Sequence, residues 1–549
     1  GSLHVRVGAP GATDDVHELF WPSEPAPIDL GALAPAGDER RRAAWRRRGR
    51  DGRATARVLQ DLPSSGRSSP SSAWTGVHRV GADPFHPTPA PDPVVNRPSS
   101  PPPSPRIGLA AGVPPFAPDP AVPARDRLLD AGFMAAHLAR TAGARGPLDL
   151  GGCRIRRAKY RIGESLRVVH EFDLDGTRYI VAARTFPADR IEAAAAKGLR
   201  RARPVAGGAL RSVWADPELG AVFWTFPNDR RLDNLRELFA PPPTISAGIG
   251  RPARFELVEY APEGSATARV SDNAGTVRAY LKAYHGRDVA ALASRYDAVA
   301  SQLVEAGAPL RTPRALAWDP TRALLALEPL PGVPWSQLGP ARLPDAFGRL
   351  GAACAAMHDL SPERLASAAA WSRPAPALGL FGRLAVPRVL NSARLVGRAR
   401  PDVEALCAEL ATGLAAGPPR ALAPDVVLHG DLHPGNVLVD GDRLNLIDLD
   451  QSGIGPAAMD LASLLARLRF ESLVGARDTA DARQLRQAFL AGYGERRRLP
   501  ATGELAWYEA AALVAERAMR AVNRVHPLGL IHLQPTLEEA RRILEESSR

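Results

Sequence analysis

Three oxygen-bearing side chains near the C-terminal end of the chain stand at a spacing suited to chemistry. Asp431 is followed five positions later by Asn436, and Asp448 follows twelve positions after that. Phosphoryl transfer needs an Asp that accepts the proton of an attacking hydroxyl, and an Asn and an Asp that hold Mg²⁺ on nucleotide phosphates. We therefore hypothesise that Asp431 is catalytic and that Asn436 and Asp448 are metal ligands.

The residues between Asn436 and Asp448 predict a β-hairpin that would bring these side chains together. Two apolar runs flank a short polar turn at residues 440–442, which is typical of two paired strands. The hairpin places Asp431 and Asn436 before its first strand and Asp448 just after its second. We expect the three side chains to converge at one end of a small sheet.

The five-residue step from Asp to Asn is that of the kinase catalytic loop. With Gly430 where protein kinases usually carry Arg, the segment resembles the aminoglycoside phosphotransferase and maltokinase branch of the protein-kinase-like superfamily. The resemblance implies supporting roles for His429 and for Asp460, which would brace the catalytic loop. Asp450 has two interpretations: it assists a second metal ion, or it only caps the turn.

Residues 246–332 have the order of a kinase N-lobe, with a hairpin, a strand bearing Lys, a helix, a strand and a hinge. The acid that would pair with this Lys is left open between Asp297 and Glu305 on the helix. A turn without the usual glycine-rich pattern would cover the phosphates, and the hinge would lie over the adenine. The nucleotide-binding residues that the resemblance implies are Lys282, Gly264, Ser265, Glu328 and Leu330.

An approximate internal repeat places a similar layout about a hundred residues upstream. The matching positions are Tyr160 and Tyr260, Ser165 and Ser265, and Arg184 and Lys282. Residues 126–245 are therefore predicted to form a second β-unit that resembles a degenerate N-lobe, similar to the N-terminal cap of maltokinases. It carries Arg where the active lobe would carry Lys.

Residues 1–125 form a tail rich in Pro, Ser and Arg that we predict to be disordered, because such a composition buries too little apolar surface to fold. The 549-residue chain has a formal net charge of +11, concentrated in Arg clusters such as residues 40–48. A nucleic-acid-binding arm is one interpretation of these clusters. We favour a solvated Arg-rich tail, and expect no nucleic-acid partner.

Cysteine content and hydropathy indicate the cellular compartment in which we expect the chain to work. Its three cysteines lack the spacing of metal ligands, and nothing in their positions predicts a disulfide. No apolar run is long enough to span a bilayer, so we expect a cytoplasmic protein without a membrane partner. The chain begins with Gly1-Ser2 and has no methionine before Met134. A tag remnant, a fragment and translation from upstream of the real start would each explain this.

Residues 333–549 predict a mostly helical C-lobe that carries the catalytic hairpin. His358 ends one of its helices, where a hydrogen-bonding role is expected. Arg517, Arg520 and Arg524 share one helix face by their three- and four-residue spacing. They would either meet a polar or anionic acceptor or form a solvated helix face.

The sequence thus predicts an α+β, protein-kinase-like two-lobe fold with an extra N-terminal β-unit and a disordered tail. The expected activity is transfer of the γ-phosphoryl of ATP (or GTP), with Mg²⁺, to a hydroxyl of a small molecule such as a sugar or aminoglycoside-like compound. The alternatives are a kinase that modifies Ser or Thr in a biosynthetic peptide precursor and a non-catalytic nucleotide-binding pseudokinase.

Overall fold

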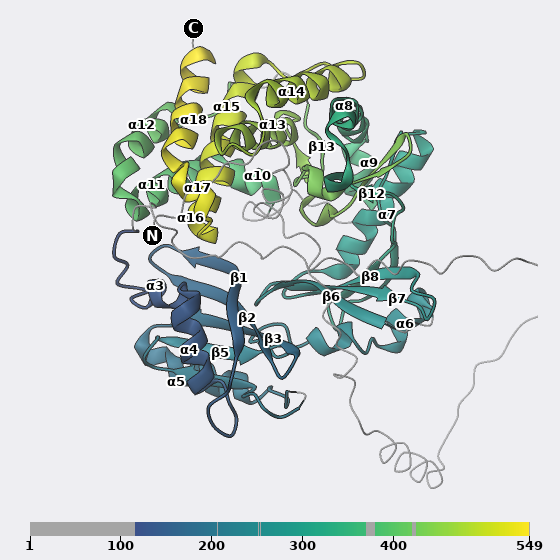
Figure 1. Ribbon diagram of the computed structural model, residues 1–549. Helices are drawn as coiled ribbons and strands as arrows, with labels where there is room; N and C mark the ends of the chain where they lie inside the picture. Colours follow the sequence, from purple (N-terminus) through teal and green to yellow (C-terminus); the bar gives the residue numbers. More distant parts are fainter. Residues whose placement is uncertain are drawn as a thin grey trace, which may run out of the picture. The chain divides into compact units, whose positions relative to one another are not determined.

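The structure is a computed structural model that describes residues 116–205, 207–250, 252, 254–368, 379–419 and 424–547. Two five-stranded antiparallel sheets are followed by a mainly helical region (Figure 1). This is the kinase-like α+β fold that the sequence predicts. The prediction of disorder for residues 1–115 lies outside the described residues. Among the described helices, none combines the length and the apolar character needed to cross a membrane.

The first sheet has the strand order β1-β2-β3-β5-β4. Neighbouring residues of its second strand belong to different apolar clusters: Val168 is in the cluster that includes Met134, and Val169 is in the cluster that includes Leu281 of the second sheet. The sheet is therefore covered on both faces, which explains why its strands lack a clean polar alternation. Its elements are α3 (Arg125–Leu128), α4 (Ala131–Thr141), β1 (Gly151–Arg161), β2 (Ser165–Leu174), β3 (Thr177–Thr185), α5 (Ile191–Leu199), β4 (Val213–Asp216) and β5 (Ala221–Thr225).

The second sheet repeats this topology, with the order β6-β7-β8-β11-β10. The side chain of Asp288 caps the following helix by accepting the backbone N–H groups of Ala290 and Ala291. The two sheets share one apolar core, in which the Trp224 indole N–H donates to the Tyr260 hydroxyl at 2.9 Å. The elements are α6 (Pro243–Ile249), β6 (Arg254–Ala261), β7 (Ser265–Ser271), β8 (Val277–Tyr284), α7 (Val289–Glu305), β10 (Ala315–Asp319) and β11 (Leu324–Leu327).

Strand register supports the internal repeat seen in the sequence. Arg184 on β3 lies opposite Arg167 on β2, and Lys282 on β8 lies opposite Thr267 on β7. Residues 167 and 267 occupy the same place in their strands, two positions after the first residue of each. Arg184 therefore holds the place in the first sheet that Lys282 holds in the second.

The same repeat appears in the hydrogen bonds around the two turns. Asp119 accepts the hydroxyl of Tyr160 at 2.6 Å and a backbone N–H of the β1–β2 turn at 2.8 Å. In the second unit, Asp229 accepts the hydroxyl of Tyr260 at 2.7 Å and the backbone N–H of Glu263 at 2.9 Å. Each turn is thus fixed by one Tyr–Asp pair.

The boundary predicted for the N-terminal tail at residue 125 is wrong for residues 116–125. Phe116 and Val122 are buried in the main core, and the N–H of Ala117 donates to the carbonyl of Ala399. These residues lack helical or strand periodicity, and for that reason the sequence pattern does not reveal them. They pack through individual buried side chains, such as Phe116 and Val122, in an irregular segment.

The C-terminal region is mostly helical, as predicted, and it also contains the helices α9 (Pro362–Ala368), α10 (Gly379–Leu384), α11 (Val386–Ala399), α12 (Glu404–Leu414) and α17 (Pro527–Ile531), which the sequence pattern does not predict. A π-helical turn at Leu513–Ala518 separates α15 (Thr502–Ala512) from α16 (Met519–Arg524). Short strands β9 (Leu310–Arg311) and β12 (Val333–Pro334) join the catalytic hairpin in a four-stranded sheet. The other elements are α8 (Leu343–His358), β13 (Val426–Leu428), β14 (Val437–Asp440), β15 (Arg443–Leu446), β16 (Gly453–Gly455), α13 (Ala458–Leu473), α14 (Thr479–Gly494) and α18 (Leu533–Ser547).

Candidate active site

The loop after β13 is fixed by the buried carboxylate of Asp460 at the start of α13. Its two oxygens accept the backbone N–H of His429 at 2.7 Å and that of Gly430 at 3.0 Å. A fully buried carboxylate needs such donors, because they replace the hydrogen bonds to water that it loses on burial. Asp460 therefore holds the backbone just before Asp431 in one conformation.

Two further features of this loop explain its residue types. The Nδ1 atom of His429 accepts the N–H of Asp431 at 3.3 Å, and its Nε2 atom lies 3.1 Å from the carbonyl oxygen of Ile447, to which it donates. Gly430 has a φ of +80°, and a Cβ there would lie 2.1 Å from the carbonyl oxygen of Gln451. A side chain at position 430 is thus excluded by both strain and contact.

The carboxylate of Asp431 faces polar groups from several parts of the chain. The amide of Gln451 donates to its Oδ2 at 3.2 Å, and the guanidinium of Arg383 lies 3.7 Å from its Oδ1. His433 Nε2 is 3.8 Å away. The side chain is partly exposed, so a hydroxyl could reach it, while these neighbours limit its orientation.

The predicted hairpin is present as β14 and β15, and it places Asn436 and Asp448 at one end. The amide nitrogen of Asn436 donates to the carbonyl of Asp431 at 3.0 Å, which leaves its Oδ1 as the atom it can offer to a cation. Asp448 adopts a left-handed conformation with φ 66° and ψ 61°, a strain that is often found at functional sites. One amide and one carboxylate oxygen, supplemented by phosphate oxygens, suit Mg²⁺.

Lys282 on β8 reaches this same end of the hairpin. Its ammonium lies 2.8 Å from Asp448 Oδ1 and 3.1 Å from Asp450 Oδ2. Burial disfavours its charge, but the two carboxylates outweigh burial and raise the pKa of Lys282 well above its usual value. Asp450 also accepts the hydroxyls of Tyr284 and Tyr296, at 2.8 and 2.9 Å. These contacts favour a positioning role for Asp450 over the binding of a second metal ion.

The helix acid expected to pair with Lys282 is not found at either predicted position. Asp297 accepts the backbone N–H of Ala315 at 2.9 Å, and Glu305 pairs with Arg364 at 2.7 Å. The residue of this helix that reaches the site is Tyr296, whose hydroxyl donates to Asp450. The carboxylates that meet Lys282 come from a segment 166 residues later in the chain, and sequence spacing gives no sign of this pairing.

The turn predicted to cover the phosphates joins β6 to β7 and contains Glu263, Gly264 and Ser265. Glu263 has a φ of +60° and a nearly fully buried carboxylate. Three arginines of the first β-unit and its C-terminal extension meet that carboxylate, and together they lower the pKa of Glu263 although burial acts to raise it. They are Arg167 at 3.4 Å, and Arg184 and Arg230 in shorter contacts.

The predicted hinge follows β11. Glu328 accepts the backbone N–H of Arg314 and the guanidinium of Arg311, both at 3.2 Å, and is thereby tied to the strand segment before β10. The carbonyl of Pro331 accepts the buried amide of Asn445 at 2.7 Å. Leu330 lies between these two attachments, so the hinge backbone is anchored on both sides of it.

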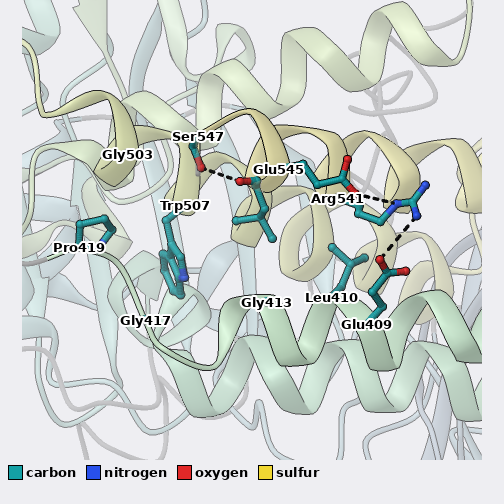
Figure 2. Close-up of a pocket in the computed structure, with 11 residues that line it drawn as sticks. Glu409, Leu410, Gly413, Gly417, Pro419, Gly503, Trp507, Arg541, Glu545 and Ser547 are labelled. Atoms are coloured by element: carbon teal, nitrogen blue, oxygen red, sulfur yellow. Dashed lines mark hydrogen bonds and ion pairs between the residues drawn. The ribbon is translucent and has the colours of Figure 1, made fainter. Parts of the chain in front are cut away.

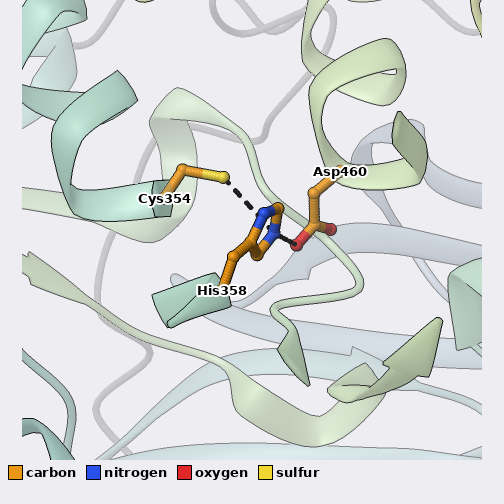
Figure 3. Close-up of side chains that lie close together, drawn as sticks. All are labelled: Cys354, His358 and Asp460. Atoms are coloured by element: carbon orange, nitrogen blue, oxygen red, sulfur yellow. Dashed lines mark hydrogen bonds and ion pairs between the residues drawn. The ribbon is translucent and has the colours of Figure 1, made fainter. Parts of the chain in front are cut away.

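A buried chain of hydrogen bonds continues from Asp460 into the helical region (Figure 3). His358 Nε2 lies 3.3 Å from Asp460 and 3.6 Å from the thiol of Cys354, and its Nδ1 lies 3.0 Å from the hydroxyl of Tyr493. Cys, His and Asp could together bind a metal ion. Asp460, however, already accepts two backbone N–H groups, so the contacts agree with the hydrogen-bonding role predicted for His358.

Sequence analysis did not identify three residues of the site: Gln451, Arg383 and Tyr296. Gln451 is adjacent to the predicted Asp450, and Tyr296 is adjacent to the predicted Asp297, so a wider window around each motif would have included them. Arg383 lies on α10, in a region without a motif. Its contacts with the Gly430 carbonyl at 3.1 Å and with Glu516 at 2.8 Å depend entirely on tertiary structure.

A separate groove of about 600 Å³ lies between α12, α15 and α18 (Figure 2). Trp507 stands at one end, and Arg541 at the other pairs with Glu409 at 3.5 Å. None of the residues predicted for phosphoryl transfer lines this groove.

A family model matches the chain from the end of β6 into the last helices. Residues 261–532 match the model of the phosphotransferase enzyme family. A methylthioribose kinase from Geobacillus kaustophilus is 38% identical over 77 residues, which is 14% of this chain and 19% of that protein, so the chain spans about a fifth of the length of this curated relative.

Solved structures that resemble the chain are more distant in sequence. A macrolide 2′-phosphotransferase from Brachybacterium faecium is 20% identical, with 55% of this chain and 98% of that chain covered and a TM-score of 0.37. A choline/ethanolamine kinase family protein from Mesorhizobium loti is 18% identical, with 56% and 93% covered and a TM-score of 0.35.

Proposed function

Residues 261–532 belong to the phosphotransferase enzyme family, and from this premise we propose that the chain transfers the γ-phosphoryl of ATP (or GTP) to a hydroxyl of a small molecule. The observation that carries the proposal is the arrangement of Asp431, Asn436, Asp448 and Lys282. Asn436 bonds to the backbone of Asp431, and Lys282 contacts Asp448. A base for the acceptor and charged groups for the phosphates are thus adjacent.

In the proposed reaction, Asp431 orients the acceptor hydroxyl and takes its proton as the oxygen attacks the γ-phosphorus. The bond between the γ-phosphorus and the bridging oxygen breaks, and ADP leaves with the bonding electrons. Gln451 and Arg383 hold the carboxylate of Asp431 for this task. Lys282 keeps its positive charge at neutral pH and is available to the nucleotide phosphates.

Asn436 and Asp448 would hold a Mg²⁺ ion, which when bound neutralises negative charge on the transferred phosphoryl group. The turn with Gly264 and Ser265 would cover the phosphates, and the hinge at Glu328 and Leu330 would meet the base. Asp450, Asp460 and His429 act as positioning residues in this proposal, because Asp450 contacts Lys282, His429 accepts the N–H of Asp431, and Asp460 holds the backbone just before Asp431.

A panel assay tests the proposal. ADP release is measured with Mg²⁺ and ATP over sugars, sugar phosphates, aminoglycosides and Ser- or Thr-containing peptides, and products are identified by the added mass of one phosphoryl group. We expect acceptor-dependent ADP release with a small molecule. Phosphorylation of peptides alone, or failure to bind ATP, would overturn the proposal.

A further inference from the structure

Six basic residues lie along a continuous path that begins at Asp431 and ends on the first β-unit. We call them the basic wall: Arg383, Arg517, Arg520, Arg524, Arg157 and Lys159. They come from α10, from the π-helical turn with α16, and from β1.

The path starts at Arg383. Its guanidinium lies 3.7 Å from Asp431 and 2.8 Å from Glu516, the residue next to Arg517. Arg517 is buried, and the charge of Arg520, three positions later, contributes to lowering its pKa. The irregular π-helical turn that contains Arg517 is a form often seen at functional sites.

The path continues from the helix to the first β-unit. Arg524 stands four positions after Arg520, and its guanidinium donates to the carbonyl of Ala158 on β1 at 3.4 Å. Arg157 and Lys159 are the chain neighbours of Ala158. Strand residues two apart share a face, and Ala158 is buried while its two neighbours keep solvent contact. Both cations are thus on the accessible face.

Like charges and burial lower the pKa of three members of the basic wall, whereas the carboxylates of Glu516 and Asp431 outweigh burial and raise the pKa of Arg383. The pKa of Arg524 lies well below its usual value, with Arg157 as the largest cause, followed by burial and Arg520. Although Lys159 is exposed, surrounding protein atoms and four nearby arginines lower its pKa to about 8. Burial and neighbouring arginines lower the pKa of Arg517 to about 9.

Carboxylates also face the basic wall: the charge of Asp431 acts on Arg383 and Arg520, and Glu516 lies 3.8 Å from Arg517. Glu516 accepts Arg383 and the hydroxyl of Ser463, and Glu259 pairs with Arg157 at 2.5 Å. Crowded guanidinium groups are costly for a fold unless an anion joins them, and Arg is well suited to bidentate recognition of phosphate and carboxylate oxygens.

We infer that the acceptor carries an oxyanion group, of the phosphate or carboxylate type, and that the basic wall binds it while its hydroxyl faces Asp431. This inference rests on the proposed function, and it deepens that function by naming the acceptor class: an anionic hydroxyl compound such as a sugar phosphate or sugar acid. A polycationic aminoglycoside is disfavoured, because it would add positive charge to a surface that already has an excess of it.

The experiment measures binding without turnover. The protein is saturated with Mg²⁺ and a non-hydrolysable ATP analogue, so that the nucleotide site is filled, and is then titrated in a calorimeter with glucose 6-phosphate, gluconate, inorganic sulfate, glucose and kanamycin. We expect the three anions to bind at least about tenfold more tightly than glucose or kanamycin. Glucose 6-phosphate and gluconate distinguish a phosphate-type group from a carboxylate.

Two variants locate the anion. The double variant Arg520→Gln/Arg524→Gln and the single variant Lys159→Gln, which changes an exposed strand residue, should each weaken anion binding without changing affinity for the ATP analogue. Arg541→Gln in the groove of Figure 2 is the matched control. Equal binding of anions and glucose would overturn the inference, and so would loss of nucleotide affinity in the double variant. Failure of the ATP analogue to bind the unaltered protein would instead count against the proposed function.

Discussion

At the level of single residues, the carboxylate of Asp431 and the ammonium of Lys282, which is proposed to hold the nucleotide, contact different partners. The carboxylate meets Gln451 and Arg383, whereas Lys282 meets Asp448 and Asp450. Asp431→Ala should therefore lower kcat by about 10²- to 10⁴-fold while nucleotide affinity stays near that of the unaltered protein. Steady-state kinetics and titration with an ATP analogue measure the two quantities. Asp442→Ala in the exposed hairpin turn is the control, and activity of Asp431→Ala within tenfold of this control would rule out the role.

Asp448 and Asn436 differ in the ligand that each would offer to a metal ion. Asp448→Asn should raise the Mg²⁺ concentration for half-maximal rate by about tenfold or more, because a carboxylate gives a hard cation both charge and an anionic oxygen. Asn436→Ala should shift it less, because water can replace a neutral ligand. Titrating Mg²⁺ against rate checks both. An unchanged Mg²⁺ curve with only a lower Tm would mean that the two residues are structural.

Lys159 gives anion binding a distinct dependence on pH. Arg157, Arg161, Arg167 and Arg524 face it, and its pKa of about 8 is lower than the 10.5 usual for Lys. Bound phosphate favours the charged form, so binding at pH 8 to 9 should take up protons, and affinity should fall as the pH rises from 7 to 9. Calorimetry in two buffers of different ionisation enthalpy measures this uptake. Lys159→Gln should remove it, and equal uptake in both proteins would contradict the assignment.

The lowered pKa of Lys159 also determines how the stability of the fold depends on pH. Between about pH 8 and 10.5 the unfolded chain binds the Lys159 proton that the folded chain has released. The contribution of Lys159 to the free energy of unfolding therefore rises with pH in this window.

At the level of elements, the β6–β7 turn is held in place by the first β-unit. The carboxylate of Glu263 meets Arg167, Arg184 and Arg230. Glu263→Gln should lower the free energy of unfolding by about 2–3 kcal/mol, since the arginines remain only partly exposed without their partner. It should also raise the KM for ATP more than it changes kcat. Denaturant unfolding and steady-state kinetics measure these effects.

Glu164→Gln in the equivalent β1–β2 turn is the matched control for this change, because Glu164 is exposed and its carboxylate pairs with Arg161 at 3.6 Å. A KM for ATP that is equal in the two variants would show that the arginines do not position the turn.

Elements built from local patterns were predictable, and contacts between separate units were not. The hairpin after Asn436 and the helix after Asp288 follow from apolar runs, turn residues and a cap. The place of Arg184 in the repeat follows from spacing, but its contact with Glu263 depends on how two sheets pack. The same holds for Lys282, whose carboxylate partners come from a different part of the fold.

At the level of the whole molecule, the residues before α3 contribute to stability. A chain that begins at residue 126 loses the buried side chains of Phe116 and Val122 and the bond between Asp119 and Tyr160. Compared with a chain that begins at residue 116, its free energy of unfolding should be lower by about 3–5 kcal/mol, mainly from the lost apolar burial. Thermal and denaturant unfolding of the two chains provide the test. Equal stability would show that this segment is dispensable.

The first β-unit touches both lobes that surround the proposed nucleotide site. Arg184 holds the β6–β7 turn of the small lobe, and the carbonyl of Ala158 accepts Arg524 of the helical lobe. Two units joined by a hinge alone can rotate about it, whereas a third unit attached to both restricts that rotation. Separating the β6–β7 turn from the helical region therefore requires one of these two attachments to break. The first β-unit, in which Arg184 stands where the second unit has Lys282, thereby restrains motion between the β6–β7 turn and the helix that carries Arg524.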